Sequence, residues 1–98
     1  MRYTDKVYVG DEGTVIILDT LIDLSDANIV KVLVKKPDGS ETEWGAVLDD
    51  ERSTCMKYII QHGDLDISGK YFLQAYVENN VGKWRGNTVI LNVHDKFR

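Results

Sequence analysis

The chain has 98 residues, 43% of them hydrophobic, and a formal net charge of −4, which is typical of one soluble domain covering residues 1–98. Its cations are scattered, with no basic cluster larger than Lys35–Lys36, so the composition argues against a nucleic-acid partner. The longest apolar stretch, Val15 to Leu18, is too short to cross a membrane. The first residues lack the apolar segment of a secretory signal, and Cys55 is the single cysteine, so we expect a reducing compartment of synthesis and no disulfide.

Apolar and polar residues alternate in stretches that recur about every ten residues, whereas helical spacing is nearly absent. Turn signals separate the stretches, and the clearest of them is Lys36-Pro37-Asp38-Gly39. About seven strands at this spacing predict one antiparallel β-sandwich of the immunoglobulin-like, all-β class. The expected strands cover residues 6–9, 14–19, 28–36, 40–44 with an extension over 46–48, 54–60, 71–78 and 88–93.

The same alternation predicts which side chains share a face of each strand. The segment from Val15 to Leu18 is apolar on both sides, which predicts a strand covered on both faces. The sets expected to share a face are Val30, Val32 and Val34; Met56, Tyr58 and Ile60; Tyr71, Leu73, Ala75 and Val77; and Val89, Leu91 and Val93.

The segment from Asp66 to Tyr71 narrows the fold further. In immunoglobulin-like sandwiches a tyrosine at the start of the sixth strand bonds through its hydroxyl to backbone in the preceding loop. Asp66, Gly69 and Tyr71 come in the order that such a tyrosine corner requires, directly before an alternating strand. Two positions later an antibody domain has a cysteine, where this chain has Leu73, so we expect apolar packing in place of the disulfide. An ordinary strand tyrosine is the alternative.

No constellation of catalytic or metal-binding residues stands out, so we expect a protein that is not an enzyme and holds no cofactor or metal. His62 and His94 are 32 residues apart and are typical of surface histidines. Cys55 lies in a patterned strand and is expected to be a small buried hydrophobic residue. A calcium site built from loop carboxylates is an alternative. The carboxylates concerned are Asp23, Asp26, Asp64 and Asp66.

Aromatic residues beside cations indicate a partner-binding surface. Trp84 stands between Lys83 and Arg85, and tryptophan and arginine are common in the energetically dominant parts of protein interfaces. In the alternative interpretation, Trp84 folds over the end of the core with its indole N–H in water. The residues expected on this surface are Trp44, Tyr76, Trp84 and Arg85.

Six short motifs cover nearly the whole length of the chain. They are Gly10 to Thr14, Asp23 to Ser25, Val34 to Gly39, Gly63 to Asp66, Gly69 to Tyr71 and Leu73 to Glu78. In combination they resemble small immunoglobulin-like structural proteins of tailed bacteriophages, which are related to the N-terminal domain of phage baseplate upper proteins.

The resemblance implies a non-catalytic virion protein that docks on the capsid, neck, tail or baseplate. Its partners would be other virion proteins, in several copies or as a homo-oligomer, without nucleic acid or membrane. Its location would be the virion, after synthesis in the bacterial host cytoplasm. Baseplate proteins continue into a stalk and receptor-binding region, whereas this sequence ends at Arg98, which favours a decoration or attachment subunit. The alternative is a carbohydrate- or receptor-binding module for host adsorption.

Overall fold

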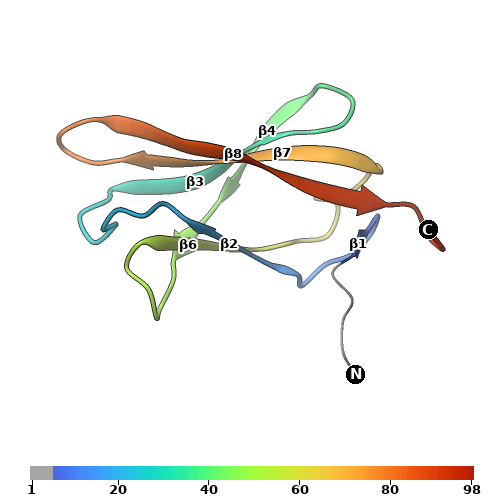
Figure 1. Ribbon diagram of the computed structural model, residues 1–98, viewed down its shortest axis with the longest axis horizontal. Helices are drawn as coiled ribbons and strands as arrows, with labels where there is room; N and C mark the ends of the chain where they lie inside the picture. Colours follow the sequence, from blue (N-terminus) through green and yellow to red (C-terminus); the bar gives the residue numbers. More distant parts are fainter. Residues whose placement is uncertain (1–5) are drawn as a thin grey trace.

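The computed structural model describes residues 6–98, which form strands arranged in two layers (Figure 1). One layer is a five-stranded sheet in the order β1-β8-β7-β3-β4, and the other is a three-stranded sheet in the order β2-β6-β5. The all-β sandwich is confirmed, and Cys55 is buried and forms no disulfide. The strands are β1 (Val7–Tyr8), β2 (Val15–Asp19), β3 (Ile29–Lys35), β4 (Glu41–Gly45), β5 (Val47–Leu48), β6 (Cys55–Ile59), β7 (Gly69–Glu78) and β8 (Lys83–His94).

Most strand boundaries lie within two residues of those expected, but two segments differ. The residues at 46–48 were expected to extend the preceding strand, and instead β5 belongs to the other sheet, where Val47 pairs with Lys57. β8 begins at Lys83, five residues before the expected start at 88. A tight hairpin causes this, because the Asn79 N–H donates to the Gly82 carbonyl at 3.0 Å. The expected domain of residues 1–98 includes residues 1–5, which lie outside the described residues.

The core lies between the layers and contains the side chains that alternation placed on common faces. Four residues of β7 (Tyr71, Leu73, Ala75 and Val77) are all buried, as are Val32 and Val34 of β3 and Met56 of β6. Two loop residues, Leu24 and Leu65, are buried with them. Alternation on β7 and β3 was therefore a reliable guide to the inward faces, because both strands lie in the middle of the large sheet. Between residues 6 and 98 there is no helix long and apolar enough to cross a membrane.

The expectation that β2 is covered on both faces was wrong. Val15 and Ile17 of β2 point away from the core and are 49% and 43% exposed. Among the described residues no further layer covers the three-stranded sheet, and Val15 lies opposite Ile59, which is also exposed. A continuous apolar run in this chain therefore marks an uncovered apolar face.

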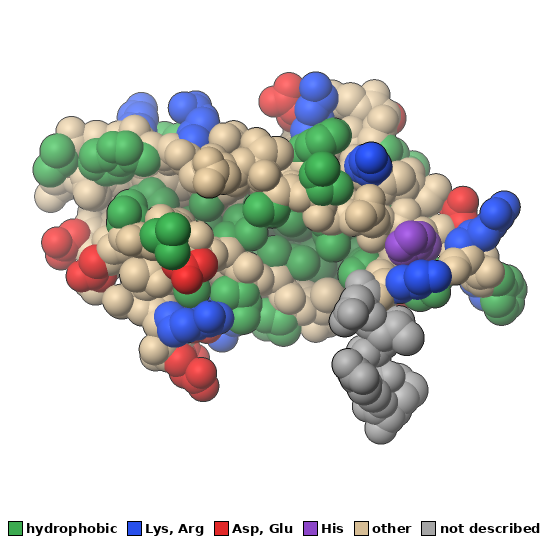
Figure 2. All heavy atoms as spheres, in the orientation of Figure 1, with side chains coloured by type: hydrophobic (Ala, Val, Ile, Leu, Met, Phe, Trp, Pro, Cys, Tyr) green, Lys and Arg blue, Asp and Glu red, His purple; other side chains and the backbone are tan. Residues whose placement is uncertain are grey.

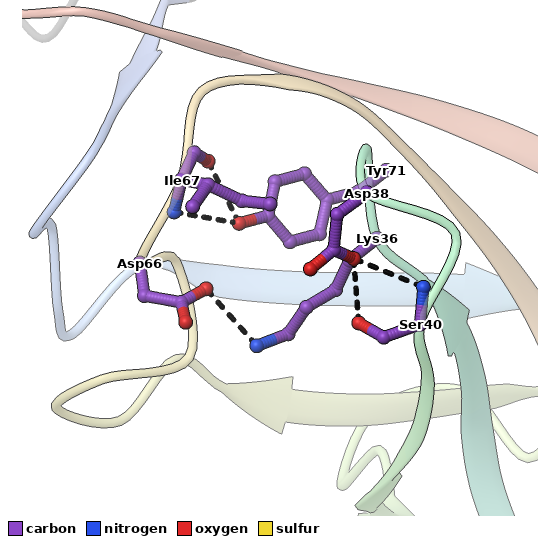
Figure 3. A network of polar contacts seen from close by, with 6 residues as sticks. All are labelled: Lys36, Asp38, Ser40, Asp66, Ile67 and Tyr71. Atoms are coloured by element: carbon purple, nitrogen blue, oxygen red, sulfur yellow. Dashed lines mark hydrogen bonds and ion pairs between the residues drawn. The ribbon is translucent and has the colours of Figure 1, made fainter.

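The tyrosine corner has the geometry that the sequence predicts (Figure 3). The Tyr71 hydroxyl donates to the Ile67 carbonyl at 2.8 Å and accepts the Ile67 N–H at 3.3 Å. The ring is fully buried, and burial is the main reason that the pKa of Tyr71 lies above its usual value. The loop before β7 is thus held against the strand at two backbone atoms.

Asp66 and Gly69 fix the same loop to the turn between β3 and β4. The Asp66 carboxylate lies 3.0 Å from the Lys36 Nζ (Figure 3), and this hydrogen bond lowers the pKa of Asp66 and raises that of Lys36. Gly69 has a φ of 128°, and a Cβ there would lie 2.7 Å from the Pro37 Cβ. Asp38 closes the turn by accepting the Ser40 N–H and hydroxyl at 2.9 and 2.6 Å.

Candidate binding surface

Trp44 does not belong to the predicted binding surface. Its side chain is 4% exposed and stacks on Tyr58 of the opposite sheet, with ring centroids 5.0 Å apart. The position on β4 explains this, because Trp44 is opposite Val32, which faces the core. β4 lies at the edge of its sheet, and its polar composition belongs to Glu41 and Glu43 on the outer face. The expectation that Trp44 is exposed is therefore corrected.

The structure brings Tyr76 and Arg85 together on the outer face of the five-stranded sheet, but Tyr76 is only 8% exposed, so the expectation that it presents its ring to a partner is corrected. They are cross-strand partners, and the Arg85 guanidinium lies 5.5 Å from the centre of the Tyr76 ring. The Lys31 Nζ lies 4.8 Å from the same ring. The Tyr76 hydroxyl donates to Glu78 at 2.9 Å, and this bond is the main cause of the raised pKa of Tyr76. The tyrosine thus holds two cations at this face, and Arg85 is exposed beside it.

Trp84 lies next to Arg85 in the chain but points to the opposite side of the sheet. Its partner on β7 is Val77, which is buried in the core, so Trp84 points inward. It is nevertheless 43% exposed, and Val89, which also points inward opposite Leu73, is 42% exposed. The three-stranded sheet therefore leaves the inner face of β8 incompletely covered.

This gap forms a groove of about 420 Å³ along one side of the sandwich, which we call the open flank. Figure 2 shows apolar side chains in the hollow between the layer that contains β8 and the layer that contains β2. The volume lies within the range of about 300–1,000 Å³ that is typical of ligand sites. The open flank is lined by Thr20, Ile22, Val77, Asn79, Trp84, Arg85 and Gly86.

β8 itself is exposed over most of its length. Every residue from Lys83 to Ile90 is exposed, on both faces of the strand. Within the part of the chain that the structure describes, its one neighbour besides β7 is β1, which pairs at Val93 and His94. Sequence reasoning found Trp84 and Arg85 on this strand but not the unpaired edge, because pairing depends on where distant strands lie.

Two other parts of the surface are candidate binding sites besides the open flank. A wider and more polar groove of about 660 Å³ runs over the outer face of the large sheet, where Lys35 pairs across the strands with Glu41 and Phe72. On the outer face of the small sheet, Val47 is 57% exposed and lies opposite Lys57. The first carries mutually neutralising charges, and the second has a smaller hollow of about 310 Å³, lined by Val47, Lys57 and Ile59 among others.

His62 and two of the loop carboxylates, Asp23 and Asp64, have structural neighbours. His62 lies 3.1 Å from Glu12, and its side chain is 95% exposed. Asp64 accepts the Tyr58 hydroxyl at 2.5 Å and the Gln61 N–H at 2.7 Å. Asp23 accepts from Ser25. In the described part of the chain, no three His, Cys, Asp or Glu side chains come together in a way that could hold a metal ion.

These features define a β-sandwich with one uncovered flank. A solved structure with the same fold is CopC from Methylosinus trichosporium OB3b, which matches with a TM-score of 0.63 over 95% of this chain and 87% of that chain. The sequence identity is 14%, so the likeness is one of fold. No family model matches the chain, and no curated protein matches it.

The expectation of a phage structural protein, and its alternative of a carbohydrate- or receptor-binding module, is corrected by this comparison. The fold matches that of CopC, and nothing among the matches indicates a phage component. The motifs behind the resemblance have structural roles here. Gly69 to Tyr71 form the corner, and the Pro37 to Ser40 turn packs against it. Such motifs are therefore explained by the fold and do not indicate the function of the protein.

Proposed function

We propose that this domain is a non-enzymatic module that binds another protein through the open flank. The observation that carries the proposal is the exposure of the inward-facing side chains of β8. Trp84 and Val89 point toward the core, yet more than two fifths of each side chain reaches solvent. Apolar side chains left accessible in a hollow, with polar residues at its rim, are a mark of interaction sites.

The residue types at the open flank support a protein partner. A tryptophan in a partly enclosed position contributes a large apolar area, and an arginine at the edge of the groove, with its guanidinium on the outer face over Tyr76, can add directed hydrogen bonds there. Both Trp84 and Arg85 line the groove, and Ile22 and Val77 supply its apolar walls. This combination suits the apolar and hydrogen-bonding groups of a polypeptide.

Copper handling is not proposed on the likeness to CopC. That likeness is one of fold at 14% identity, and the residues described here bring His62 together with a single carboxylate, Glu12. The point is open to measurement by calorimetric titration with copper(II) sulfate. Saturable uptake of one equivalent that is lost in His62→Ala would favour metal handling over the proposal.

The test of the proposal is a binding assay with a synthetic peptide array of apolar, acidic, basic and mixed ten-residue sequences. We expect the wild-type domain to bind a subset of the array and Trp84→Ser to lose that binding. The matched control is Val47→Ser, which removes a comparably exposed apolar side chain from the small sheet. Equal binding by Trp84→Ser and wild type, or loss in Val47→Ser instead, would overturn the proposal. So would a wild-type domain that binds no peptide.

A further inference from the structure

We infer that the partner supplies an extended segment, with alternating apolar and acidic residues, that pairs as an added strand with the free edge of β8 between Lys83 and Ile90. The inference rests on the proposed function and names the chemistry of the partner.

The unpaired edge of β8 is the first observation that points to an added strand. β7 pairs with β8 from Lys83 to Val93, with an irregularity at Gly86 and Asn87, while on the other side, among residues 6–98, β1 pairs only at Val93 and His94. In an antiparallel pair the backbone groups of alternate residues point away from the partner strand. The free edge therefore offers a row of N–H and C=O groups, which is what an extended peptide recognises in strand addition.

The side chains of β8 determine the pattern that an added strand must have. Trp84 points inward and lines the open flank, opposite Val77, while Val89 points inward further along β8, opposite Leu73. Side chains directly opposite one another on neighbouring strands lie on the same face. The alternation of β8 is interrupted between Arg85 and Thr88, where its register with β7 shifts, so the segment from Lys83 to Arg85 sets the pattern. An added strand beside this segment places the residue next to Trp84 in the open flank, where an apolar residue fits, and the residues on either side of it on the outer face.

The outer face of β8 carries two cations at this edge. Lys83 and Arg85 point outward, and within the described part of the chain neither has a carboxylate within 4 Å. Glu78 is opposite Lys83 in register, but its carboxylate accepts the Tyr76 hydroxyl. Acidic residues on the outward positions of an added strand complement both cations as cross-strand pairs.

A second copy of this chain fits the edge less well. Between Lys83 and His94 there is no aspartate or glutamate. An edge-to-edge pairing of two copies of β8 would therefore place no carboxylate beside Lys83 or Arg85. The charges favour a different protein as the source of the strand.

The experiment measures peptide binding by isothermal titration calorimetry. The probes are a ten-residue peptide of alternating leucine and glutamate and its leucine–lysine counterpart. We expect the wild-type domain to bind the acidic peptide, and Lys83→Glu/Arg85→Glu to bind it about tenfold more weakly and to prefer the basic one. The control Lys70→Glu/Lys96→Glu changes the net charge equally at exposed positions away from the free edge, and should bind as wild type does.

A third peptide separates this inference from the proposed function. It carries N-methyl groups on every residue of the acidic sequence, so neither of its backbone edges can donate to β8. Strand addition requires that it bind at least tenfold more weakly. Equal binding would overturn strand addition, while the Trp84→Ser result would still decide whether the open flank binds at all. Failure of the wild-type domain to bind the acidic peptide, or a dimer in sedimentation equilibrium that Arg85→Glu abolishes, would also overturn the inference.

Discussion

The Trp44 indole lies nearly parallel to the Tyr58 ring, at an interplanar angle of 12°, and joins β4 of the large sheet to β6 of the small one. This stack closes the side of the sandwich remote from β8. We expect Trp44→Ala to lower the free energy of unfolding by about 3–5 kcal/mol, because it opens a cavity between the layers. Urea unfolding measures the loss. Trp84→Ala is the matched control and should cost far less, since its side chain is 43% exposed.

The second prediction concerns the contribution of the Tyr71 hydroxyl to stability. Tyr71→Phe keeps the buried ring and removes both hydrogen bonds to Ile67, so the domain should lose about 0.5–1.5 kcal/mol of stability. Tyr76→Phe is the comparison, because its hydroxyl bonds to a carboxylate on the outer face of the sheet. If thermal unfolding of Tyr71→Phe matched that of wild type, the corner would contribute nothing to stability.

Gly69 tests the contact between the corner and the neighbouring turn. A methyl group there would approach the Pro37 side chain to within 3 Å, and the backbone conformation disfavours any Cβ. We expect Gly69→Ala to cost about 1–3 kcal/mol in chemical denaturation. Gly45→Ala provides the control, because a Cβ at Gly45 has no atom within 4 Å and needs no positive φ. Equal stability of the two variants would show that the loop shifts without cost.

The raised pKa of Tyr58 predicts how the stability of the domain changes at high pH. Burial, followed by the hydrogen bond to Asp64, raises the pKa of Tyr58 to about 12. Because the folded-state pKa lies above the unfolded value of about 10, the contribution to stability is complete below pH 10 and is lost as the pH rises toward 12. Unfolding free energies measured over this range should fall less steeply in Tyr58→Phe.

Asp64→Asn tests how much the hydrogen bond to Asp64 contributes to the raised pKa of Tyr58. It removes the carboxylate that accepts the Tyr58 hydroxyl, so the pKa of Tyr58 should move down toward its usual value without reaching it, because burial remains. The difference in phenolate absorbance between each protein and its Tyr58→Phe counterpart reports the titration. An unchanged midpoint in Asp64→Asn would mean that burial alone sets the pKa.

Much of the fold could be predicted because local chemistry determined it. Alternation on β7 identified the inward face of a central strand, and the order of Asp66, Gly69 and Tyr71 identified the corner. Each depends on residues that are neighbours in the chain. The clearest turn was equally local, with Pro37, Asp38 and Gly39 in the positions that their conformations favour.

The candidate site could be predicted only in part. Trp84 and Arg85 were recognisable by type, but the burial of Trp44 depends on Tyr58 from the opposite sheet, 14 positions away in the sequence. The open flank is also non-local, since it exists because β2 and β5 end a sheet that is narrower than its partner. Likewise, the uncovered outer face of β2 is set by the absence of a layer and not by any residue in that strand.

The contrast between the two tryptophans gives the domain a pair of built-in optical reporters. Trp44 sits in an apolar environment between the sheets, while Trp84 is in contact with water. Blue-shifted emission that iodide cannot quench will therefore come from Trp44 and follow folding. The quenchable, red-shifted emission will come from Trp84 and should respond when the groove is occupied. With only two tryptophans in the chain, a single Trp84→Phe substitution separates the two signals.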